Sequence, residues 1–513
     1  MLTKYRSFII AFLLGGLLTL TFAPFYYWPL LFVAIGGIFL LLESAKSTAN
    51  SSKVAIKTGF CLGFCFGFGF FTTSLYWICA SLLIDAVSFA WLIPFALTLI
   101  PALLACYFAV VFAVFVYLSI RNNYNFWQKS ILFSLLWLVA ELLRSLLFSG
   151  FPWNLLGYTS LSFGYLSQIA DLFGVYGVSF LLCWWSLLLI AVKYNSDRSI
   201  FRYLATTIIS IALSFGYGYY KISNRPNDNK VLNIRLVQAN IPQAMKWQED
   251  EKINNLNKYL DLSSKQPNDH LDAVIWPETA LPFAVSNLNQ GDLSQALARA
   301  IPPNGNLITG LVSLNYQQQN LQIFNSIASI DRNSNINIYH KHHLVPFGEY
   351  VPLQQYLSFL FLDKVIETIT DGAVGFNAGK GPATIVANNF SFSPLICYEV
   401  IFSNKAINNK QQPDLFINAT NDGWFGNTIG PYQHLAHAQM RAIEYGLPLL
   451  RVAGTGISAY INQYGIVVDK IDLQQQGVID VKVDNWRQQT IYARFGNLLL
   501  VILLFCLLLL KKI

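Results

Sequence analysis

Long apolar runs fill the first part of the chain and return at its end, whereas residues 223–492 mix apolar and polar positions as an ordinary globular domain does. Each run is close to or above the ~20 residues that a helix needs to cross a bilayer, although the first two are short. The pattern predicts eight membrane-spanning helices, at residues 7–23, 28–43, 55–82, 88–118, 127–147, 165–193, 203–221 and 493–510.

The chain therefore divides into three parts. We expect a membrane domain of seven helices at residues 1–222, a globular domain at 223–492, and a last helix with a short tail at 493–513. The third predicted span is rich in glycine and phenylalanine, and small residues of this kind allow membrane helices to approach closely.

Short β-branched runs alternate with amphipathic stretches in the globular domain. This alternation favours an α/β layered domain over a β-sandwich or a helix bundle. The predicted strands are 234–239, 273–276, 307–312, 326–330, 384–387, 415–418 and 457–461. The predicted helices are 252–263, 293–300 and 432–445.

Composition and charge support a membrane protein with a defined orientation. Only 12% of the residues are charged, against about 25% in soluble proteins. Lysine and arginine precede the first span and follow the second, fourth, sixth and last, whereas the loops around 24–27, 83–87 and 148–163 have none. The positive-inside rule then places both termini in the cytoplasm and the globular domain outside it. The net charge of +7 is largely explained by the cytoplasmic flanks, so it does not indicate nucleic-acid binding.

Cys397 is the one cysteine of seven that lies outside the apolar runs. With a single thiol, the globular domain has no pair for a disulfide, although it would face an oxidising compartment. Cys397 is therefore either a small core residue or a nucleophile.

Two other reactive residues lie, like Cys397, where predicted strands end. Glu278 follows Val274-Ile275-Trp276-Pro277, and Lys341 lies within a histidine-rich segment. A carboxylate can take a thiol proton, and an ammonium group can stabilise a thiolate and then an oxyanion. A helix beginning after Cys397 would lower the thiol pKa further. Taken singly, each of these residues is more commonly a solvated loop residue or a core residue. Residue type alone therefore does not show that the three form an active site.

The segments around these residues carry a family resemblance. Trp276-Pro277-Glu278, the run from Lys341 to Glu349, and Cys397-Tyr398-Glu399 resemble the Glu–Lys–Cys signature of the nitrilase superfamily. Together with the flanking spans, the pattern resembles the membrane-embedded branch of that superfamily, the apolipoprotein N-acyltransferase family. The resemblance implies an αββα sandwich for the globular domain.

The resemblance also implies roles for individual residues. Glu278 would be the general base, Lys341 the stabiliser of the oxyanion, and Cys397 the nucleophile. The matching residues near the family's active site are Trp247, Glu349, Tyr398 and Glu399. Glu349 would orient Lys341, and the backbone amide of Tyr398 would serve as an oxyanion donor. The family uses no metal and no cofactor.

The function implied is acyl transfer in a bacterial inner membrane. A phospholipid would donate an acyl chain to Cys397 as a thioester. The N-terminal α-amino group of an S-diacylglyceryl-cysteine apolipoprotein would then accept it, in the last step of lipoprotein maturation. We expect a monomer with the catalytic domain facing the periplasm. The alternatives are a membrane-anchored amidase with the same three residues and, from another class, a transporter or receptor whose globular domain only binds.

Several histidines invite a metal-site interpretation, which we disfavour. His340 and His342 flank Lys341, but no matching cysteine or carboxylate cluster stands near them. His434 and His437 lie three residues apart on a predicted helix, and we expect them on its polar face.

Two further features lie outside the predicted triad. Glu141 and Arg144, near the outer end of the fifth span, favour an ion pair between helices; the alternative is contact with a headgroup or with the globular domain. The apolar stretch 356–362 is either core or a lid that dips into the outer leaflet.

Overall fold

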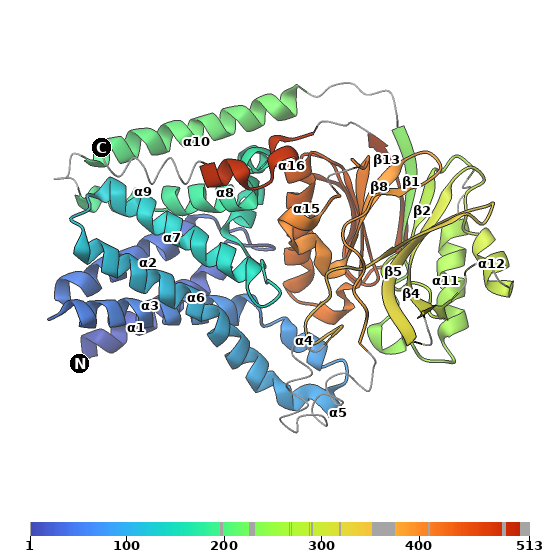
Figure 1. Cartoon of the computed structure of the whole chain (residues 1–513), viewed down its shortest axis with the longest axis horizontal. Coiled ribbons are helices and arrows are strands. Elements are labelled where there is room, and N and C mark those ends of the chain that lie inside the picture. Colours follow the sequence, from blue (N-terminus) through green and yellow to red (C-terminus); the bar gives the residue numbers. More distant parts are fainter. Residues whose placement is uncertain are drawn as a thin grey trace.

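The chain folds into a helical bundle and a β-rich domain that pack side by side (Figure 1). The computed structural model describes residues 2–194, 199–224, 231–265, 267, 269–286, 288, 291–317, 320–350, 375–408, 411–484 and 489–502. The stretch 356–362, predicted as core or lid, lies outside these described residues.

Long helices build the N-terminal bundle, with short helices between them. The long ones are α1 (Leu2–Thr19), α2 (Pro29–Thr48), α3 (Ser52–Ser74), α6 (Ile93–Arg121), α7 (Phe126–Leu146), α8 (Ala170–Trp185) and α10 (Ser199–Ser223). The short ones are α4 (Ile78–Leu82), α5 (Ala86–Phe89) and α9 (Leu188–Ala191). A last helix, α16 (Ile491–Phe495), returns to this bundle and packs against α8.

Five helical segments in the described part of the chain are long and apolar enough to cross a membrane. They are Pro29–Thr48, Ser52–Ser74, Ala86–Arg121, Leu166–Ala191 and Ser199–Ser223. The apolar part of α1 is shorter, at Tyr5–Thr19. Helix α7 carries three charged residues, and the last predicted span is described only to residue 502. The number of eight spans therefore stays a prediction.

Glycines let the bundle helices approach one another closely. A Cβ atom on Gly63 of α3 would lie 2.6 Å from the carbonyl oxygen of Phe108 on α6. A Cβ on Gly69 of the same helix would collide with the backbone of Phe12 on α1. The prediction that small residues in this span permit close helix packing is confirmed.

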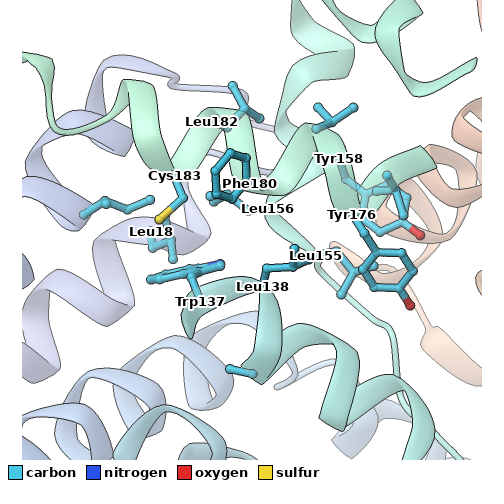
Figure 2. Close-up of a cluster of buried hydrophobic side chains, with 14 of the residues drawn as sticks. Leu18, Trp137, Leu138, Leu155, Leu156, Tyr158, Tyr176, Phe180, Leu182 and Cys183 are labelled. Atoms are coloured by element: carbon cyan, nitrogen blue, oxygen red, sulfur yellow. The ribbon is translucent and has the colours of Figure 1, made fainter. Parts of the chain in front are cut away.

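An apolar core holds α1, α7 and α8 together (Figure 2). Leu18 of α1, Trp137 and Leu138 of α7, and Phe180 of α8 all take part. The loop after α7 adds Leu155, so this loop is anchored inside the bundle before it reaches the β-rich domain.

Two mixed sheets form the β-rich domain. The first has the order β13-β1-β2-β4-β5-β6, with β3 also paired to β4. Its strands are β1 (Val231–Gln238), β2 (Ala273–Ile275), β3 (Ala284–Val285), β4 (Asn306–Gln317), β5 (Asn320–Asp331), β6 (Ile336–His340) and β13 (Gly477–Asp484). Strands β1, β2 and β4 run parallel.

The second sheet has the order β12-β11-β10-β9-β8-β7. Its strands are β7 (Ile385–Val386), β8 (Ser391–Ile396), β9 (Leu415–Thr420), β10 (Leu449–Ala453), β11 (Ser458–Ile461) and β12 (Val467–Ile471). Strands β8, β9 and β10 run parallel, and every residue of β9 is buried, as expected for a central parallel strand.

The two sheets face each other between layers of helices. Ile234 and Ile275 of the first sheet pack against Ile417 and Leu450 of the second. Helix α11 (Lys252–Ser264) packs on the outer face of the first sheet, near α12 (Gly291–Ala298). Helix α15 (Gly430–Tyr445) covers the second sheet and separates it from the membrane bundle (Figure 1). This is the αββα arrangement that the resemblance implies.

Candidate active site

The structure brings Glu278, Lys341 and Cys397 together between the two sheets. Glu278 follows β2, Lys341 follows β6, and Cys397 follows β8 of the opposite sheet. All three are buried, with at most 8% of each residue exposed. Side chains at the ends of facing strands converge on one point because the sheets that carry them are packed together.

Lys341 lies between two carboxylates. Its Nζ is 2.8 Å from Glu349 Oε1 and 3.8 Å from Glu278 Oε1. Burial alone would lower the pKa of Lys341, but the two carboxylates more than offset it and raise the pKa above its ordinary value. Lys341 is therefore a fixed cation. Burial also raises the pKa of Glu278, which makes its carboxylate a stronger proton acceptor.

Asn325 of β5 links the same two carboxylates. Its Nδ2 donates to Glu278 Oε1 at 2.7 Å and to Glu349 Oε1 at 3.0 Å. Glu349 Oε2 in turn accepts from the backbone N–H of Val345 at 2.8 Å. Asn325 was not predicted as a site residue; the available signal was its place directly before the predicted strand 326–330, two strands after the one that Glu278 follows.

Cys397 holds an unusual backbone conformation. Its φ is 47°, in the left-handed region that residues with a side chain rarely adopt, and a short 3₁₀ helix, Cys397–Ile401, begins there. Strain of this kind clusters where a side chain must be presented to a site. The Thr420 side chain lies close enough to lower the pKa of the thiol, although burial more than offsets this effect.

The resting thiol is protonated, contrary to the expectation of a lowered pKa. Burial raises the pKa of Cys397 to about 12, and the Glu278 carboxylate adds to the shift while Lys341 opposes it. The short helix after Cys397 does not overcome these effects. The thiol therefore needs a base beside it during the reaction, and Glu278 is in place to act as one.

Glu399 joins the loops that carry Lys341 and Cys397. Its Oε1 accepts from the Tyr339 hydroxyl and from the backbone N–H of His342, each at 2.8 Å. Its Oε2 accepts from the backbone N–H of Ile396 at 2.8 Å. One buried carboxylate thus fixes the end of β6 relative to the end of β8.

Tyr398 and Trp247 lie at the edges of the site. The Tyr398 hydroxyl donates to the carbonyl oxygen of Gly150, in the loop after α7, at 2.9 Å. Trp247 follows the 3₁₀ turn Gln243–Met245 and is 42% exposed, next to the buried Lys246. Tyr398 therefore faces the membrane bundle, and Trp247 faces the surface.

His434 and His437 are buried rather than on a polar helix face, so that prediction is wrong. His434 Nε2 lies 3.2 Å from the carbonyl oxygen of Cys397, and its Nδ1 lies 3.0 Å from Asp422 Oδ1. Arg451 donates to Asp422 Oδ2 at 2.6 Å. Arg451 and His434 overcome the effect of burial and lower the pKa of Asp422 to about 2. These side chains support the loop of Cys397 from the side of α15.

Helix α7 contacts the β-rich domain through the loop after it. Glu141 and Arg144 both lie on α7, and each bonds to this loop rather than forming an ion pair between two helices. Glu141 Oε1 accepts from the backbone N–H of Leu156 at 2.8 Å, and Arg144 donates to the carbonyl oxygen of Phe151 at 2.8 Å. Trp153, in this loop, donates to Gln433 Oε1 of α15 at 2.8 Å. Glu141 and Arg144 thus hold the loop whose Trp153 reaches the β-rich domain, so they contribute to docking only indirectly; contact with a lipid headgroup stays a prediction.

The histidines near Lys341 have protein partners. His340 Nδ1 lies 2.8 Å from Ser326 Oγ, and His342 Nδ1 lies 2.7 Å from Glu399 Oε1. Within the described residues, no three His, Cys, Asp or Glu side chains form a group that could hold a metal ion.

Known proteins match both parts of the chain. Residues 14–188 match the apolipoprotein N-acyltransferase N-terminal domain, and residues 233–492 match the carbon-nitrogen hydrolase family. A CN-hydrolase superfamily protein from Xanthomonas campestris covers 50% of the chain, and the chain covers 91% of it, with 18% identity and a TM-score of 0.37.

Two relatives match this chain over nearly its full length. An apolipoprotein N-acyltransferase of Rickettsia bellii is 35% identical over 98% of this chain and 96% of its own length. The protein of the same name from Rhodopseudomonas palustris is 34% identical over 99% of this chain and 96% of its own length. With its apolar helices, the chain is a multi-pass membrane protein. It belongs to the apolipoprotein N-acyltransferase family and is an acyltransferase.

Proposed function

We propose that the protein transfers an acyl chain from a membrane phospholipid to the N-terminal α-amino group of an S-diacylglyceryl-cysteine apolipoprotein, with Cys397 as the acyl carrier. The observation that carries the proposal is the buried cluster of Glu278, Lys341 and Cys397 in a domain bonded directly to the loop after helix α7 of the membrane bundle. The names of the full-length relatives support the same reaction.

In the first half-reaction, Glu278 takes the proton of the Cys397 thiol. The thiolate attacks the ester carbonyl carbon of the phospholipid, and the bond from that carbon to the glycerol oxygen breaks. Glu278 returns the proton to the departing oxygen, which leaves as a lysophospholipid, and the acyl chain stays on Cys397 as a thioester. Lys341 and the backbone amide of Tyr398 stabilise the oxyanion.

In the second half-reaction, the α-amino group of the apolipoprotein attacks the thioester carbonyl. The carbon–sulfur bond breaks, and an amide forms. Glu278 receives the amine proton and passes it to the sulfur, which restores the thiol. Glu349 orients Lys341, Glu399 fixes the Cys397 loop, and Trp247 contacts substrate at the surface of the site.

Attachment to the membrane suits substrates that are themselves held in a bilayer. Each buried methylene of an acyl chain contributes about 0.8 kcal/mol to membrane binding, so a catalyst in water would seldom meet either substrate. The bonds from Tyr398 to Gly150 and from Trp153 to Gln433 support a site held close to the membrane bundle.

The proposal includes a topology. Residues 1–222 form seven spans, 223–492 the catalytic domain, and 493–513 an eighth span and tail. Both termini lie in the cytoplasm and the catalytic domain faces the periplasm across the bacterial inner membrane, as the distribution of lysine and arginine supports. The protein acts as a monomer without a metal or cofactor.

Labelled phospholipid tests the proposal. Wild-type enzyme incubated with a phospholipid radiolabelled in its acyl chains acquires a label that hydroxylamine removes. Cys397→Ala does not acquire it, whereas Cys106→Ala, which changes an exposed cysteine of α6, acquires it as the wild type does. A wild-type enzyme that N-acylates the apolipoprotein without ever carrying the label would contradict the thioester. Hydrolysis of small amides without acyl transfer would favour an amidase.

A further inference from the structure

Lys246 is a second buried lysine beside the candidate active site. Only 8% of the residue is exposed. Its Nζ donates to the backbone carbonyl oxygen of Glu278 at 3.0 Å and to Thr279 Oγ1 at 2.6 Å. The ammonium group therefore binds the main chain of the residue that takes the thiol proton.

The segment that Lys246 binds has little freedom. Thr279 has a φ of 46°, in the left-handed region, which costs energy for a β-branched residue. On β4, a Cβ added to Gly310 would lie 2.5 Å from both Pro277 O and Thr279 N. Strand β4 and Lys246 together hold Glu278 in a conformation that the chain would not adopt by local preference.

The charges of the site also require Lys246. Glu278 and Glu349 are two buried carboxylates, and Lys341 lies nearer to Glu349 than to Glu278, at 2.8 Å against 3.8 Å. Glu278 Oε2 is buried and has no hydrogen-bond partner among the described residues. With Lys341 as the only cation, the set would carry one uncompensated negative charge, which is costly in a buried site.

Lys246 keeps enough of its positive charge to balance the net negative charge of Glu278, Glu349 and Lys341. Burial lowers the pKa of Lys246 to about 8; the Glu278 carboxylate opposes the effect of burial, and so does Cys397 when it is a thiolate. At neutral pH the group is still mainly an ammonium. Its charge in turn lowers the pKa of Glu278, together with the charge of Lys341 and the Asn325 hydrogen bond, against the effects of burial and Glu349.

We propose that Lys246 is a positioning residue of the acyl-transfer site: its ammonium fixes the Glu278 main chain and, as the second cation beside Lys341, keeps the Glu278 carboxylate ionised until it takes the thiol proton. The inference rests on the proposed roles of Glu278 and Cys397. It adds a second lysine, which acts on Glu278 and not on the substrate.

The pH profile of acyl-enzyme formation separates a charge role from a merely structural one. In Lys246→Met, we expect the acid limb of the pH profile for acyl-enzyme formation to move up by about 1 pH unit, so that the rate at neutral pH falls by up to about tenfold. Lys246→Arg retains the charge, so its acid limb stays near that of the wild type. Thr279→Val removes one acceptor without changing the charge and also leaves the limb in place. Lys265→Met, at an exposed lysine after α11, is the matched control and changes neither quantity.

Alkylation of Cys397 by iodoacetamide, followed by peptide mass mapping over the same pH range, needs no acyl donor. The inference predicts slower alkylation at neutral pH in Lys246→Met and recovery at higher pH. If this shift occurs but the wild type forms no acyl-enzyme, the proposed function fails and the role of Lys246 stands. An unchanged acid limb in Lys246→Met, or an arginine variant that shifts as far as the methionine variant, would overturn the inference.

Discussion

The indole of Trp153 stacks on the imidazole of His434, with ring centroids 5.5 Å apart and 29° between the ring planes. Trp153 belongs to the loop after membrane helix α7, and His434 lies on α15 with its Nε2 3.2 Å from the carbonyl oxygen of Cys397. Only one side chain therefore separates the membrane loop from the backbone of the candidate nucleophile.

Removal of Trp153 should affect the site through this contact. Trp153→Ala empties a fully buried position and removes the bond to Gln433, which we expect to cost about 3–5 kcal/mol of folding stability. We also expect acyl-enzyme formation to slow by about tenfold or more, because the Cys397 loop loses its support. Thermal unfolding in detergent and the labelling rate measure the two effects. Trp91→Ala, at an exposed tryptophan of the bundle, is the control; equal losses in both variants would show that the stacking carries no special role.

Asn325 should set the ionisation of the carboxylate pair. Asn325→Leu removes the donor shared by Glu278 and Glu349, so the pKa of Glu278 should rise and activity at neutral pH should fall by about 10–100-fold, with partial recovery at higher pH. Asn337→Leu, at an exposed asparagine on the neighbouring strand β6, serves as the matched control. A loss of activity that is the same at every pH would contradict an effect on ionisation.

Glu399 should be a structural requirement as well as a functional one. In Glu399→Gln, an amide N–H₂ replaces one of two oxygens that both accept hydrogen bonds, so at least one buried donor loses its partner. We expect a loss of about 2–4 kcal/mol in stability and a large loss of acyl-enzyme formation. Unfolding midpoints and labelling check this prediction. A variant with normal stability and normal labelling would show that the hydrogen bonds of the Glu399 carboxylate are dispensable.

Acidification should weaken the contact between the two parts of the chain. Burial lowers the pKa of His437 well below its ordinary value, so the folded protein holds this residue neutral. Below about pH 6.5 the unfolded chain binds a proton that the folded protein does not, so stability is lost as the pH falls. We expect the melting temperature to drop between about pH 7.5 and about pH 5.5, and to drop less in His437→Phe. An equal drop in both proteins would assign the acid sensitivity to other groups.

The clear alternation of β-branched runs and amphipathic helices predicted an α/β layered domain, and the family resemblance implied its αββα order. The predicted strands do not include β3, β6, β8, β10, β12 or β13. Strand β8 contains Pro394, which argues against a central strand, yet Pro394 lies opposite Ile417 of β9 in a parallel pair. Strand β13 alternates exposed and buried residues only toward its end, so its periodicity is weak.

Motifs around the three reactive residues predicted them and, through the family resemblance, Glu349 and Glu399 beside them. The same motifs did not predict Lys246 or Asn325. Lys246 and Asn325 reach Glu278 only after the loop at 243–247 and strand β5 come together in space. The burial of His434 depends on the membrane loop that covers it. Contacts between segments so far apart leave no local pattern in the sequence.

The most direct test of the account is the mass of the peptide that contains Cys397, measured after incubation with phospholipid and before the acceptor is added. The account predicts an increase equal to one acyl chain, located on the Cys397 sulfur, that disappears when the diacylglyceryl apolipoprotein is supplied. An unmodified Cys397 in enzyme that goes on to N-acylate the acceptor would contradict the account.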